Sequence, residues 1–163
     1  MILQAWTDRP IITGNLFNPA FTCEVLRECI KGYMSETSQN FPFALSILVL
    51  PFVLPERYRI TLPRTKATTM HSWLNNNEHL KVELDKHVKG LIRFSKEAIM
   101  FGVIHDVLRI DDQGNIEALG KKTKASLASD DANDCLSKAL IWGKVLSRAG
   151  DSFTIYSLLG IKP

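Results

Sequence analysis

The feature that most constrains this chain is an apolar block that runs into closely spaced prolines. Residues 41–50 read FPFALSILVL, and the chain then continues as LPFVLPERYRITLPRT over Leu50–Thr65. A helix that is apolar around its whole circumference must be buried on most sides, inside the domain or against a partner. Pro51 and Pro55 are expected to end this helix, because an interior proline costs about 3 kcal/mol. Leu50–Thr65 is therefore predicted to be an irregular, proline-stiffened passage.

A membrane span is the first alternative for this block. A spanning helix needs about 20 apolar residues, whereas the apolar stretch Phe43–Leu54 is much shorter and contains Pro51. The N-terminus, MILQAWTDRP, lacks the basic start and long apolar run of a signal peptide. The chain has 163 residues, of which 45% are hydrophobic, and this allows one domain with a real core. We therefore expect a single domain over residues 1–163, located in the cytoplasm and without membrane contact.

The segments on either side of the block are predicted to be helices. Asn18 is a candidate N-cap, with Pro19 in the first turn, for a helix that covers residues 18–36. Three shorter helices are predicted downstream, over residues 65–77, 78–94 and 96–106. Each of them has a residue near its start that favours helix caps, namely Thr65, Asn77 and Ser95.

After these helices, the stretch VLRIDDQGNIEAL predicts a β-hairpin within Val107–Leu119, in which Gly114 supplies the positive φ of the turn. Helices followed by a two-stranded wing are typical of a winged helix-turn-helix. The expected fold class is therefore mainly α, a single helical domain with a winged-helix-like β-hairpin. The polar and basic stretch GKKTKASLAS predicts a flexible linker at residues 120–128. A C-terminal helical segment is expected over residues 129–163, with Ser129 as its cap.

Sequence motifs of catalysis and metal binding were not found. There is no P-loop, no G-x-G-x-x-G, no nucleophile elbow and no H-E-x-x-H. His79 and His87 lie about 12 Å apart on a predicted helix, too far for one metal ion to bridge. A pair such as Cys23 with His71 stays open, because folding can bring distant residues together. We expect no catalytic, cofactor-binding or metal-binding residue, and we expect the three cysteines to be reduced and mostly buried.

Two basic clusters are candidates for contact with nucleic acid. One surrounds Tyr58, and the other lies just beyond the predicted hairpin and consists of Lys121, Lys122 and Lys124. Wing tips often contact DNA phosphates, and phosphate contacts supply most non-specific affinity. The predicted helix before the hairpin, SKEAIMFGVIHDV, is largely apolar, whereas a recognition helix presents polar side chains to base edges. Weak contact with the DNA backbone is therefore better supported than sequence-specific reading, and a solvated surface is the alternative for both clusters.

Several short motifs, taken in this order, resemble one known family. NPAF with LRECIKGY, LVLPFVL, LPRT, HSWL and the ending AGDSFTIYSLLGIKP are similar to the middle component of bacterial three-component ABC systems, which overlap with Lamassu-type anti-phage defence. The resemblance runs from Asn18 to Pro163, except that residues 117–133 match nothing. The positions that carry it are Asn18, Pro19, Phe21, Leu62, Pro63, Arg64, Thr65, His71, Trp73, Thr154, Tyr156 and Gly160.

The resemblance implies a small accessory protein without known catalysis, and it gives none of these positions a chemical role. Such proteins act beside an SMC-like ABC ATPase and an effector, often a nuclease. The expected function is therefore a non-enzymatic adaptor that links the ATPase to the effector in defence against phages or plasmids. A free-standing winged-helix DNA-binding regulator is the alternative, and it needs a polar recognition helix. A small hydrolase is the second alternative, and it needs a catalytic constellation.

The proline-stiffened passage is the predicted contact with these partners. An apolar block this dense is difficult to bury wholly within so small a domain, and large exposed apolar patches usually mark interaction sites. Prolines reduce the conformational freedom lost on binding, and aromatic residues and Arg are enriched at interfaces. The predicted partner-binding residues are Phe52, Arg57, Tyr58, Arg59, Arg64 and Trp73.

Overall fold

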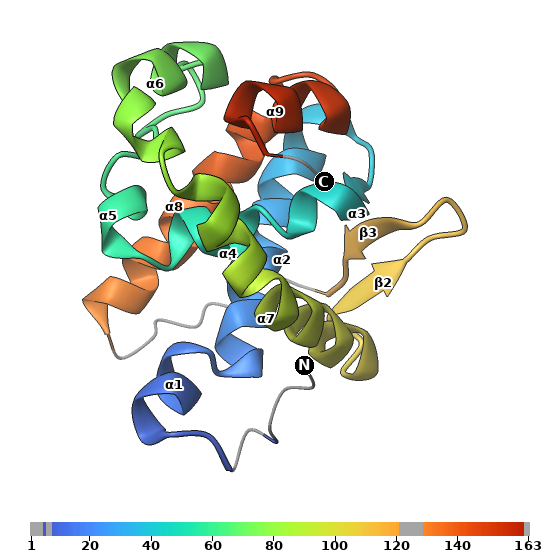
Figure 1. The fold of residues 1–163 in the computed structure, drawn as a ribbon. Helices are drawn as coiled ribbons and strands as arrows, with labels where there is room; N and C mark the ends of the chain where they lie inside the picture. Colours follow the sequence, from blue (N-terminus) through green and yellow to red (C-terminus); the bar gives the residue numbers. More distant parts are fainter. Residues whose placement is uncertain (1–4, 6–7, 121–128, 162–163) are drawn as a thin grey trace.

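The computed structural model describes residue 5, residues 8–120 and residues 129–161. In these residues helices dominate, and a small three-stranded antiparallel sheet stands out on one side (Figure 1). The prediction of a mainly helical fold with a hairpin is confirmed at this level. The predicted linker at residues 120–128 lies, from residue 121 onward, outside the described residues.

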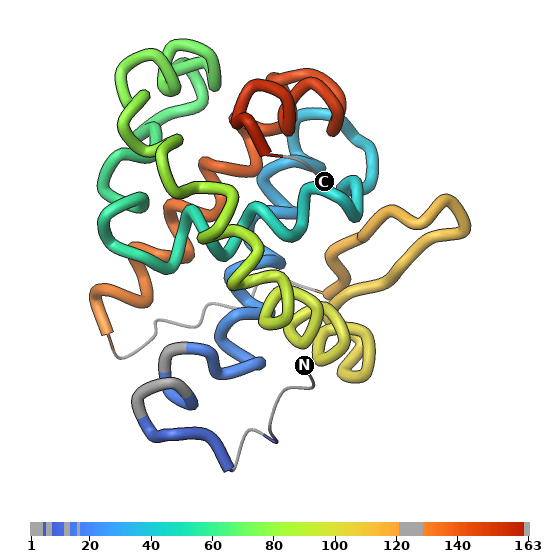
Figure 2. The backbone as a smooth tube through the Cα atoms, in the orientation of Figure 1, coloured from blue at the N-terminus to red at the C-terminus, as the bar shows by residue number. Residues whose placement is uncertain are grey.

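The described elements follow one another in an order close to the predicted one. They are α1 (Ile11–Leu16), α2 (Pro19–Thr37), β1 (Phe41–Pro42), α3 (Phe43–Ser46), α4 (Val49–Val53), α5 (Glu56–Arg59), α6 (Met70–Asn76), a 3-10 helix (Glu78–Lys81), α7 (Leu84–Ile104), β2 (Leu108–Ile110), β3 (Asn115–Ala118), α8 (Asp130–Leu146) and α9 (Ser152–Leu159). The long helices α2 and α7 pack against each other, and the hairpin folds back beside the end of α7 (Figure 2). No helix in the described ranges is long and apolar enough to cross a membrane.

Several predicted helix caps are confirmed. The side chain of Asn18 accepts a hydrogen bond from the backbone N–H of Ala20 at 2.9 Å, directly before Pro19 at the first position of α2. Ser129 accepts from the N–H of Ala132 at the start of α8. These side chains satisfy backbone donors that a helix cannot pair internally, so the local sequence alone fixes where both helices begin.

Three predicted helix starts, at Thr65, Asn77 and Ser95, are wrong. Helix α6 begins at Met70 rather than near Thr65, and its cap is the hydroxyl of Thr69. Asn77 precedes only the 3-10 helix Glu78–Lys81, and its side chain makes no cap bond. From Leu84 the helices expected over residues 78–94 and 96–106 form the single helix α7, and Ser95 is buried inside it rather than at a start. Apolar side chains on both sides of Ser95 are buried together, including Phe94. Continuous burial of this face overrides the preference of serine for a helix start.

The sheet extends the predicted hairpin by one strand. Strands β2 and β3 pair antiparallel, with Ile110 opposite Ile116, and Gly114 in the turn has a φ of 80°. Strand β1, which was not predicted, pairs with the other edge of β3 and places Phe41 opposite Ile116. It covers only two residues, which is too short for an alternating apolar pattern to reveal it. Through β1 the hairpin is attached directly to the start of the apolar block.

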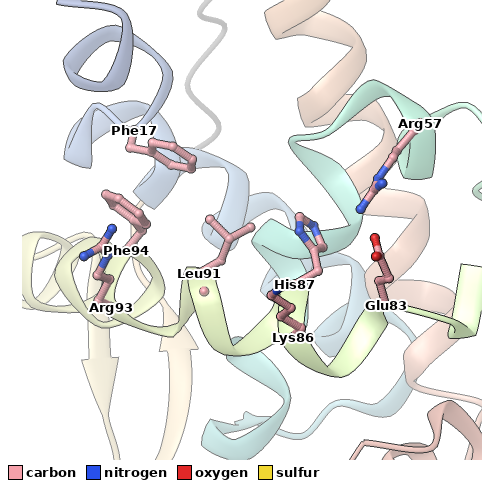
Figure 3. A pocket seen from close by; sticks show the side chains of 9 residues that line it. Phe17, Arg57, Glu83, Lys86, His87, Leu91, Arg93 and Phe94 are labelled. Carbon is pink, nitrogen blue, oxygen red and sulfur yellow. The ribbon is translucent and has the colours of Figure 1, made fainter. Parts of the chain in front are cut away.

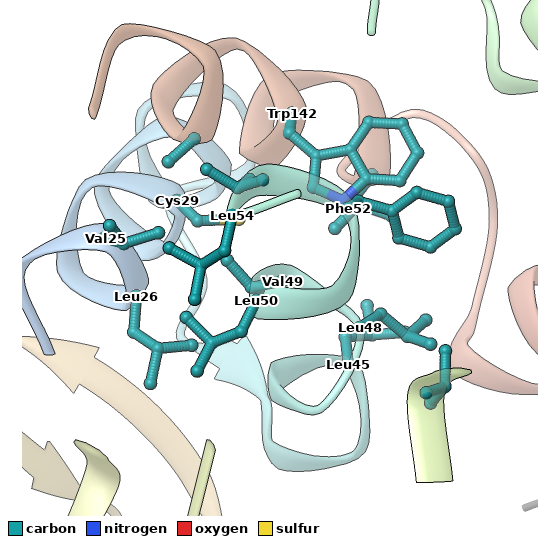
Figure 4. Packing of buried hydrophobic residues seen from close by; sticks show 14 of the residues in the cluster. Val25, Leu26, Cys29, Leu45, Leu48, Val49, Leu50, Phe52, Leu54 and Trp142 are labelled. Carbon is teal, nitrogen blue, oxygen red and sulfur yellow. The ribbon is translucent and has the colours of Figure 1, made fainter. Parts of the chain in front are cut away.

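The apolar block folds as two short helices, α3 and α4, rather than one, and α5 follows in the proline-stiffened passage. Pro51 does not end a helix, because it is the third residue of α4, where an N–H has no partner within the helix. Pro55 does separate α4 from α5, with extended backbone angles. Side chains from all of Leu48–Leu54 are buried (Figure 4), and α4 is packed by α2, α7 and α8. The domain, which was expected to have difficulty in burying the block wholly, buries most of it, and Phe43 near its start is 38% exposed.

The contact between α2 and α8 is unusually close. A Cβ added at Gly143 would lie 1.9 Å from the carbonyl oxygen of Cys29, and one added at Gly32 would lie 2.1 Å from the carbonyl oxygen of Leu140. Neither position can carry a side chain unless the two helices move apart. The two glycines thus set the distance between the helices that enclose α4.

Candidate functional site

Three aromatic residues that were predicted to contact a partner lie in the protein interior. Phe52, Tyr58 and Trp73 are buried. The ring of Phe52 meets the rings of Tyr58 and Trp73 edge to face, at centroid distances of 5.8 and 5.6 Å, and Trp142 of α8 lies 5.1 Å away. Such ring pairs contribute about 0.5–1.5 kcal/mol beyond the area that they bury. The predicted surface position of these three residues is corrected, because they form part of the core.

Arg59 is also buried, with 3% of its surface exposed. Its guanidinium forms ion pairs with Asp131 and Asp134 at the start of α8. It also donates hydrogen bonds to the carbonyls of Val53 and Leu54, at 3.1 and 2.7 Å. Arg59 therefore joins α5 to α8 and satisfies carbonyls at the end of α4. These contacts use its donors within the chain, so the predicted role at an interface is corrected for Arg59 as well.

Arg57 and Arg64, by contrast, are exposed. The guanidinium of Arg57 lies 4.7 Å from the centre of the Tyr58 ring and donates to the Tyr58 hydroxyl at 3.3 Å. Within the described ranges, neither arginine has a carboxylate partner within ion-pair distance. Of the six residues predicted for partner binding, these two keep surface positions, and a contact with a partner stays a prediction for them.

Arg57 stands at one end of a groove, which we call the α7 groove (Figure 3). Its volume is about 540 Å³, within the range of about 300–1,000 Å³ that is usual for binding pockets. Phe17 lines it from the residue before α2, and Glu83 lines it from the residue before α7. Helix α7 provides the floor, because residues three or four apart share one helix face. The floor consists of Lys86, His87, Gly90, Leu91, Arg93 and Phe94.

One end of the α7 groove is apolar. The rings of Phe17 and Phe94 are stacked, with centroids 4.0 Å apart and planes 14° apart. The guanidinium of Arg93 lies 4.9 Å from the centre of the Phe94 ring. Leu91 points into the space between this pair and the charged end (Figure 3). Because neighbours cover Phe94, this end offers an apolar wall rather than an open aromatic face.

The other end carries charge. Lys86 and Arg57 face the groove together with Glu83, whose carboxylate points toward Arg57 (Figure 3). With Arg93, the lining contains three cations and one carboxylate, so its potential is positive when His87 is neutral. The α7 groove thus combines an apolar half with a cationic half, a combination that suits an acidic and partly apolar ligand.

His87 connects this groove to the core. Its ring stacks on Tyr58 at 4.9 Å, and its Nε2 lies 3.1 Å from the carbonyl oxygen of Pro51. Since a carbonyl only accepts, Nε2 carries the hydrogen of this bond. Burial lowers the pKa of His87, and the nearby charge of Arg57 lowers it further, although the bond to Pro51 acts in the opposite direction. The neutral imidazole is therefore favoured in the folded protein.

A second hollow of about 540 Å³ lies at the hairpin turn and is lined by polar side chains. Asp111 occupies its centre and accepts hydrogen bonds from the side chain of Asn40 at 2.8 Å and from the N–H groups of Asn115 and Gln113. These bonds, that of Asn40 above all, lower the pKa of Asp111. They hold the turn in place, and the arrangement is explained by the architecture of the hairpin.

The cysteines and histidines are not assembled into a reactive cluster. Cys23, Cys29 and Cys135 are free and buried; burial raises the pKa of Cys23 to about 12 and that of Cys135 to about 11. His71 is exposed on α6, where its Nε2 lies 3.3 Å from the side chain of Asn75, whereas Cys23 is buried beside Gly102. Over residues 8–120 and 129–161, no group of three His, Cys, Asp or Glu side chains is placed to hold a metal ion.

The predicted nucleic-acid contacts Lys121, Lys122 and Lys124 lie outside the described residues. The hairpin that precedes them can be examined. Arg109 of β2 pairs with Glu117 of β3 at 3.0 Å, and the turn itself carries Asp111 and Asp112. The described part of the hairpin therefore presents acidic rather than basic side chains at its tip, which is unfavourable for contact with phosphates.

Apolar side chains are exposed at the far end of α7. Met100, Val103 and Ile104 are spaced to share one helix face, and Met100 and Ile104 are 63% and 71% exposed. Ile110 of the adjacent strand β2 is exposed as well. We call these four residues the outer apolar face. Most of the block that was predicted to contact a partner is buried, whereas this face, predicted as a largely apolar helix and a hairpin strand, is a group of neighbouring apolar side chains that stays exposed.

Sequence reasoning also missed the α7 groove. Residues 83, 87, 90, 91 and 94 fall within the one helix predicted over residues 78–94, but the groove also needs Phe17 and Arg57, which come from distant parts of the sequence. The positions that carry the family resemblance have structural roles where contacts define them. Asn18 caps α2, the hydroxyl of Tyr156 donates to the carbonyl of Ala44 at 2.6 Å, and Gly160 ends α9 with a φ of 69°.

Comparison with known proteins yields one match. A family model described as "ABC-three component (ABC-3C) system Middle Component 3" matches residues 6–163. Neither the curated proteins nor the solved structures contain a match to this chain. The family model covers α2, α7, α8 and the hairpin together, so the match concerns the whole described architecture.

Proposed function

The chain belongs to the Middle Component 3 family of ABC-three component systems, and from this we propose that it is the non-enzymatic adaptor subunit of such a system. In this proposal it links an SMC-like ABC ATPase to an effector, for which a nuclease is the first candidate. The biological setting would be defence against phages or plasmids, as in Lamassu-like systems. Membership of the family supports an assembly with other components of the system. The bridging role, the ATPase and effector partners and the defence setting are proposed.

The outer apolar face is the observation that carries this proposal. Met100, Val103 and Ile104 stay exposed in a chain that buries a far denser apolar block. Large exposed apolar patches in soluble proteins usually mark interaction sites, because their contact with water is unfavourable. A middle component must contact at least one other protein. An apolar helix face next to a projecting hairpin provides a suitable surface for that contact.

The alternative of a free-standing winged-helix regulator is less well supported. The helix before the hairpin, α7, presents apolar side chains at its exposed end rather than the polar ones that read bases. The described hairpin turn carries Asp111 and Asp112. A winged-helix arrangement stays a prediction, and as an adaptor feature it would use the hairpin to contact protein.

The test is co-expression of the chain with the ATPase and effector encoded beside it, followed by affinity purification and size exclusion. We expect a stable complex. The double variant Met100→Ser with Ile104→Asp should weaken it about thirtyfold, because loss of buried anchors costs about 2 kcal/mol or more of binding. Phe153→Asp is the matched control, since Phe153 of α9 is 78% exposed and lies outside this face. A wild-type chain that remains monomeric beside both components would refute the adaptor role.

The proposed absence of catalysis needs a separate assay. The purified chain, alone and in the complex, is incubated with DNA and with ester substrates. We expect no turnover that depends on Cys23, Cys29, His71 or His105. If one Ala variant at these positions stayed folded and abolished a measurable turnover, the chain would be an enzyme.

A further inference from the structure

Gly90, in the floor of the α7 groove, is a helix glycine that the fold itself does not require. Gly32, Gly102 and Gly143 also lie within helices, and a Cβ added at any of them would come within 2.1, 2.7 or 1.9 Å of a neighbouring atom. At Gly90, a Cβ would meet no atom of the described residues within 4 Å. Apart from proline, glycine is the poorest helix former. Internal packing explains Gly32, Gly102 and Gly143 and leaves Gly90 unexplained.

Two of these helix glycines, Gly32 and Gly143, stand where another backbone passes close by, whereas Gly102 lies against the side chains of Leu108 and Cys23. Gly32 and Gly143 allow α2 and α8 to approach each other until main-chain carbonyls lie against the glycines. At Gly90, a backbone could approach α7 equally closely, but from outside the domain. Leu91 is placed beside it, and Phe17 and Phe94 lie farther along the apolar half (Figure 3). The floor is therefore shaped for a second polypeptide backbone that lies directly over Gly90.

The charges of the groove indicate what such a polypeptide carries. Arg57 and Lys86 are exposed at the charged end, and neither has an ion-pair partner among the described residues. Arg93 adds a third cation, and Glu83 is the one carboxylate of the lining. Carboxylates of a bound segment would complement this charge, and complementary charge favours both encounter and register.

Single-stranded nucleic acid fits the groove less well. Such ligands are bound by a continuous cationic track with open aromatic faces on which bases stack. Phe94 is buried and covered by the ring of Phe17 and the guanidinium of Arg93. Glu83 would also repel phosphate. The apolar half of the groove would not contribute to binding a nucleic acid strand.

We propose that the α7 groove is the docking site for an acidic, amphipathic helix of another component of the system. Its backbone lies over Gly90, its apolar side chains pack against Phe17 and Leu91, and its carboxylates pair with Arg57 and Lys86. This inference rests on the proposed adaptor function and adds to it the chemistry of one partner. From residue 83 to residue 94 the groove extends about 16 Å, which matches about three turns of a helix.

The experiment uses the co-expressed complex and measures the affinity of the chain for the ATPase and for the effector. Gly90→Leu fills the groove, and Arg57→Glu with Lys86→Glu reverses its charge; each should weaken one of the two interactions at least tenfold. Lys96→Glu is the matched control, because Lys96 is an exposed lysine of α7 outside the lining. A photo-cross-linking amino acid at position 86 should link to an acidic helical segment of the same partner. Circular dichroism and melting of each variant confirm that it is folded.

Each other outcome decides against the inference. If folded groove variants bind both partners as the wild type does, while the outer apolar face variant does not, the adaptor role stands and the groove is not its docking site. If the wild-type chain forms no complex, the adaptor role fails and the docking proposal fails with it. If the groove variants keep the complex but lose binding of an oligo-dT strand, the groove is a nucleic-acid site instead.

Discussion

Arg57 and Arg59 lie two residues apart in α5, yet one belongs to the interior and the other to the α7 groove. Arg59 is buried, pairs with Asp131 and Asp134, and bonds to two carbonyls. Arg57 is exposed over the ring of Tyr58 and has no carboxylate partner among the described residues. The same residue type is fully used by the fold in one place and left available in the other.

The glycines of the two regions repeat this contrast. Gly143 is required because α2 leaves no room for a side chain, whereas Gly90 faces open space. In the interior, each unusual residue is explained by a neighbour that it contacts. In the groove, Arg57 contacts Tyr58 but has no carboxylate partner among the described residues, and Gly90 has no neighbour that excludes a side chain. Features that folding leaves unexplained are the more informative guide to binding, and the predictions below test this division.

The largest effect is expected at the contact between α2 and α8. Gly143→Ala should lower the free energy of unfolding by about 3 kcal/mol, the upper part of the usual range for overpacking. The new Cβ would lie 1.9 Å from the carbonyl oxygen of Cys29 and 2.9 Å from the amide nitrogen of Tyr33. Backbone atoms cannot turn away as a flexible side chain can. Urea unfolding followed by circular dichroism measures the loss, and a loss below about 1 kcal/mol would show that the helices are free to separate.

The next largest effect on stability is expected for Arg59, compared with its neighbour Arg57. Arg59→Met should cost about 2 kcal/mol, because the carbonyls of Val53 and Leu54 lose their donor in a buried place. The full penalty for breaking a buried ion pair is not expected, since Asp131 and Asp134 are exposed to water. Arg57→Met should change stability by no more than about 0.5 kcal/mol, as is usual at the surface. Equal losses in the two variants, measured by chemical denaturation, would contradict the division between interior and groove.

The division explains which parts of the structure could be predicted from the sequence. Helix starts at Asn18 and Ser129 and the turn at Gly114 were predictable, because a few neighbouring residues determine each of them. Strand β1 and the course of the chain at Pro51 were not. Their conformations depend on Ile116 and on the helices around α4, which are distant in the sequence.

Of the residues predicted for partner binding, only Arg57 lines the α7 groove, and Arg64 keeps a surface position outside its lining. An aromatic or cationic residue in a proline-rich passage has the same local pattern whether it faces the core or the solvent. Phe52 and Arg59 turned inward because Trp142, Asp131 and Asp134 of α8 are there to receive them. The α7 residues of the groove lie within one predicted helix, but Phe17 and Arg57 complete the groove from distant segments. Their positions depend on how the chain packs, and no short window of sequence contains that information.

Gly90→Ala should produce a smaller change of opposite sign. We expect a gain of about 0.5–1 kcal/mol in the free energy of unfolding, because alanine loses less conformational freedom in a helix and has room at this position. Gly32→Ala, in the same kind of helix but against α8, serves as the control and should be destabilising. The measurement is urea unfolding of both variants. If Gly90→Ala lowered stability, internal packing would account for the glycine and the contrast with Gly143 would disappear.

The smallest expected effect belongs to His87, which lines the groove and also contacts the core. Burial lowers its pKa below the usual value of 6.5, so near that pH the unfolded chain binds more protons than the folded one. Stability should therefore rise with pH through this region. It should fall as the pH drops below about 6.5, until the folded state is protonated as well. Arg57, Lys86 and Glu83 are the charged groups near His87 in the lining of the same groove.

Urea unfolding of the wild type and of His87→Gln at about pH 5.5, 6.5 and 7.5 isolates this contribution, because the other three histidines are common to both proteins. Glutamine keeps an N–H donor for the carbonyl of Pro51. The stability difference between the two proteins should therefore favour the wild type most at the highest pH. Asp111 and Asp151, whose pKa values are lowered from 3.8 by hydrogen bonds, act at more acidic pH and do not overlap. If stability depended on pH in the same way in both proteins, burial would not affect the titration of His87. His87 would then belong to the solvent-exposed groove, like Arg57, rather than to the core.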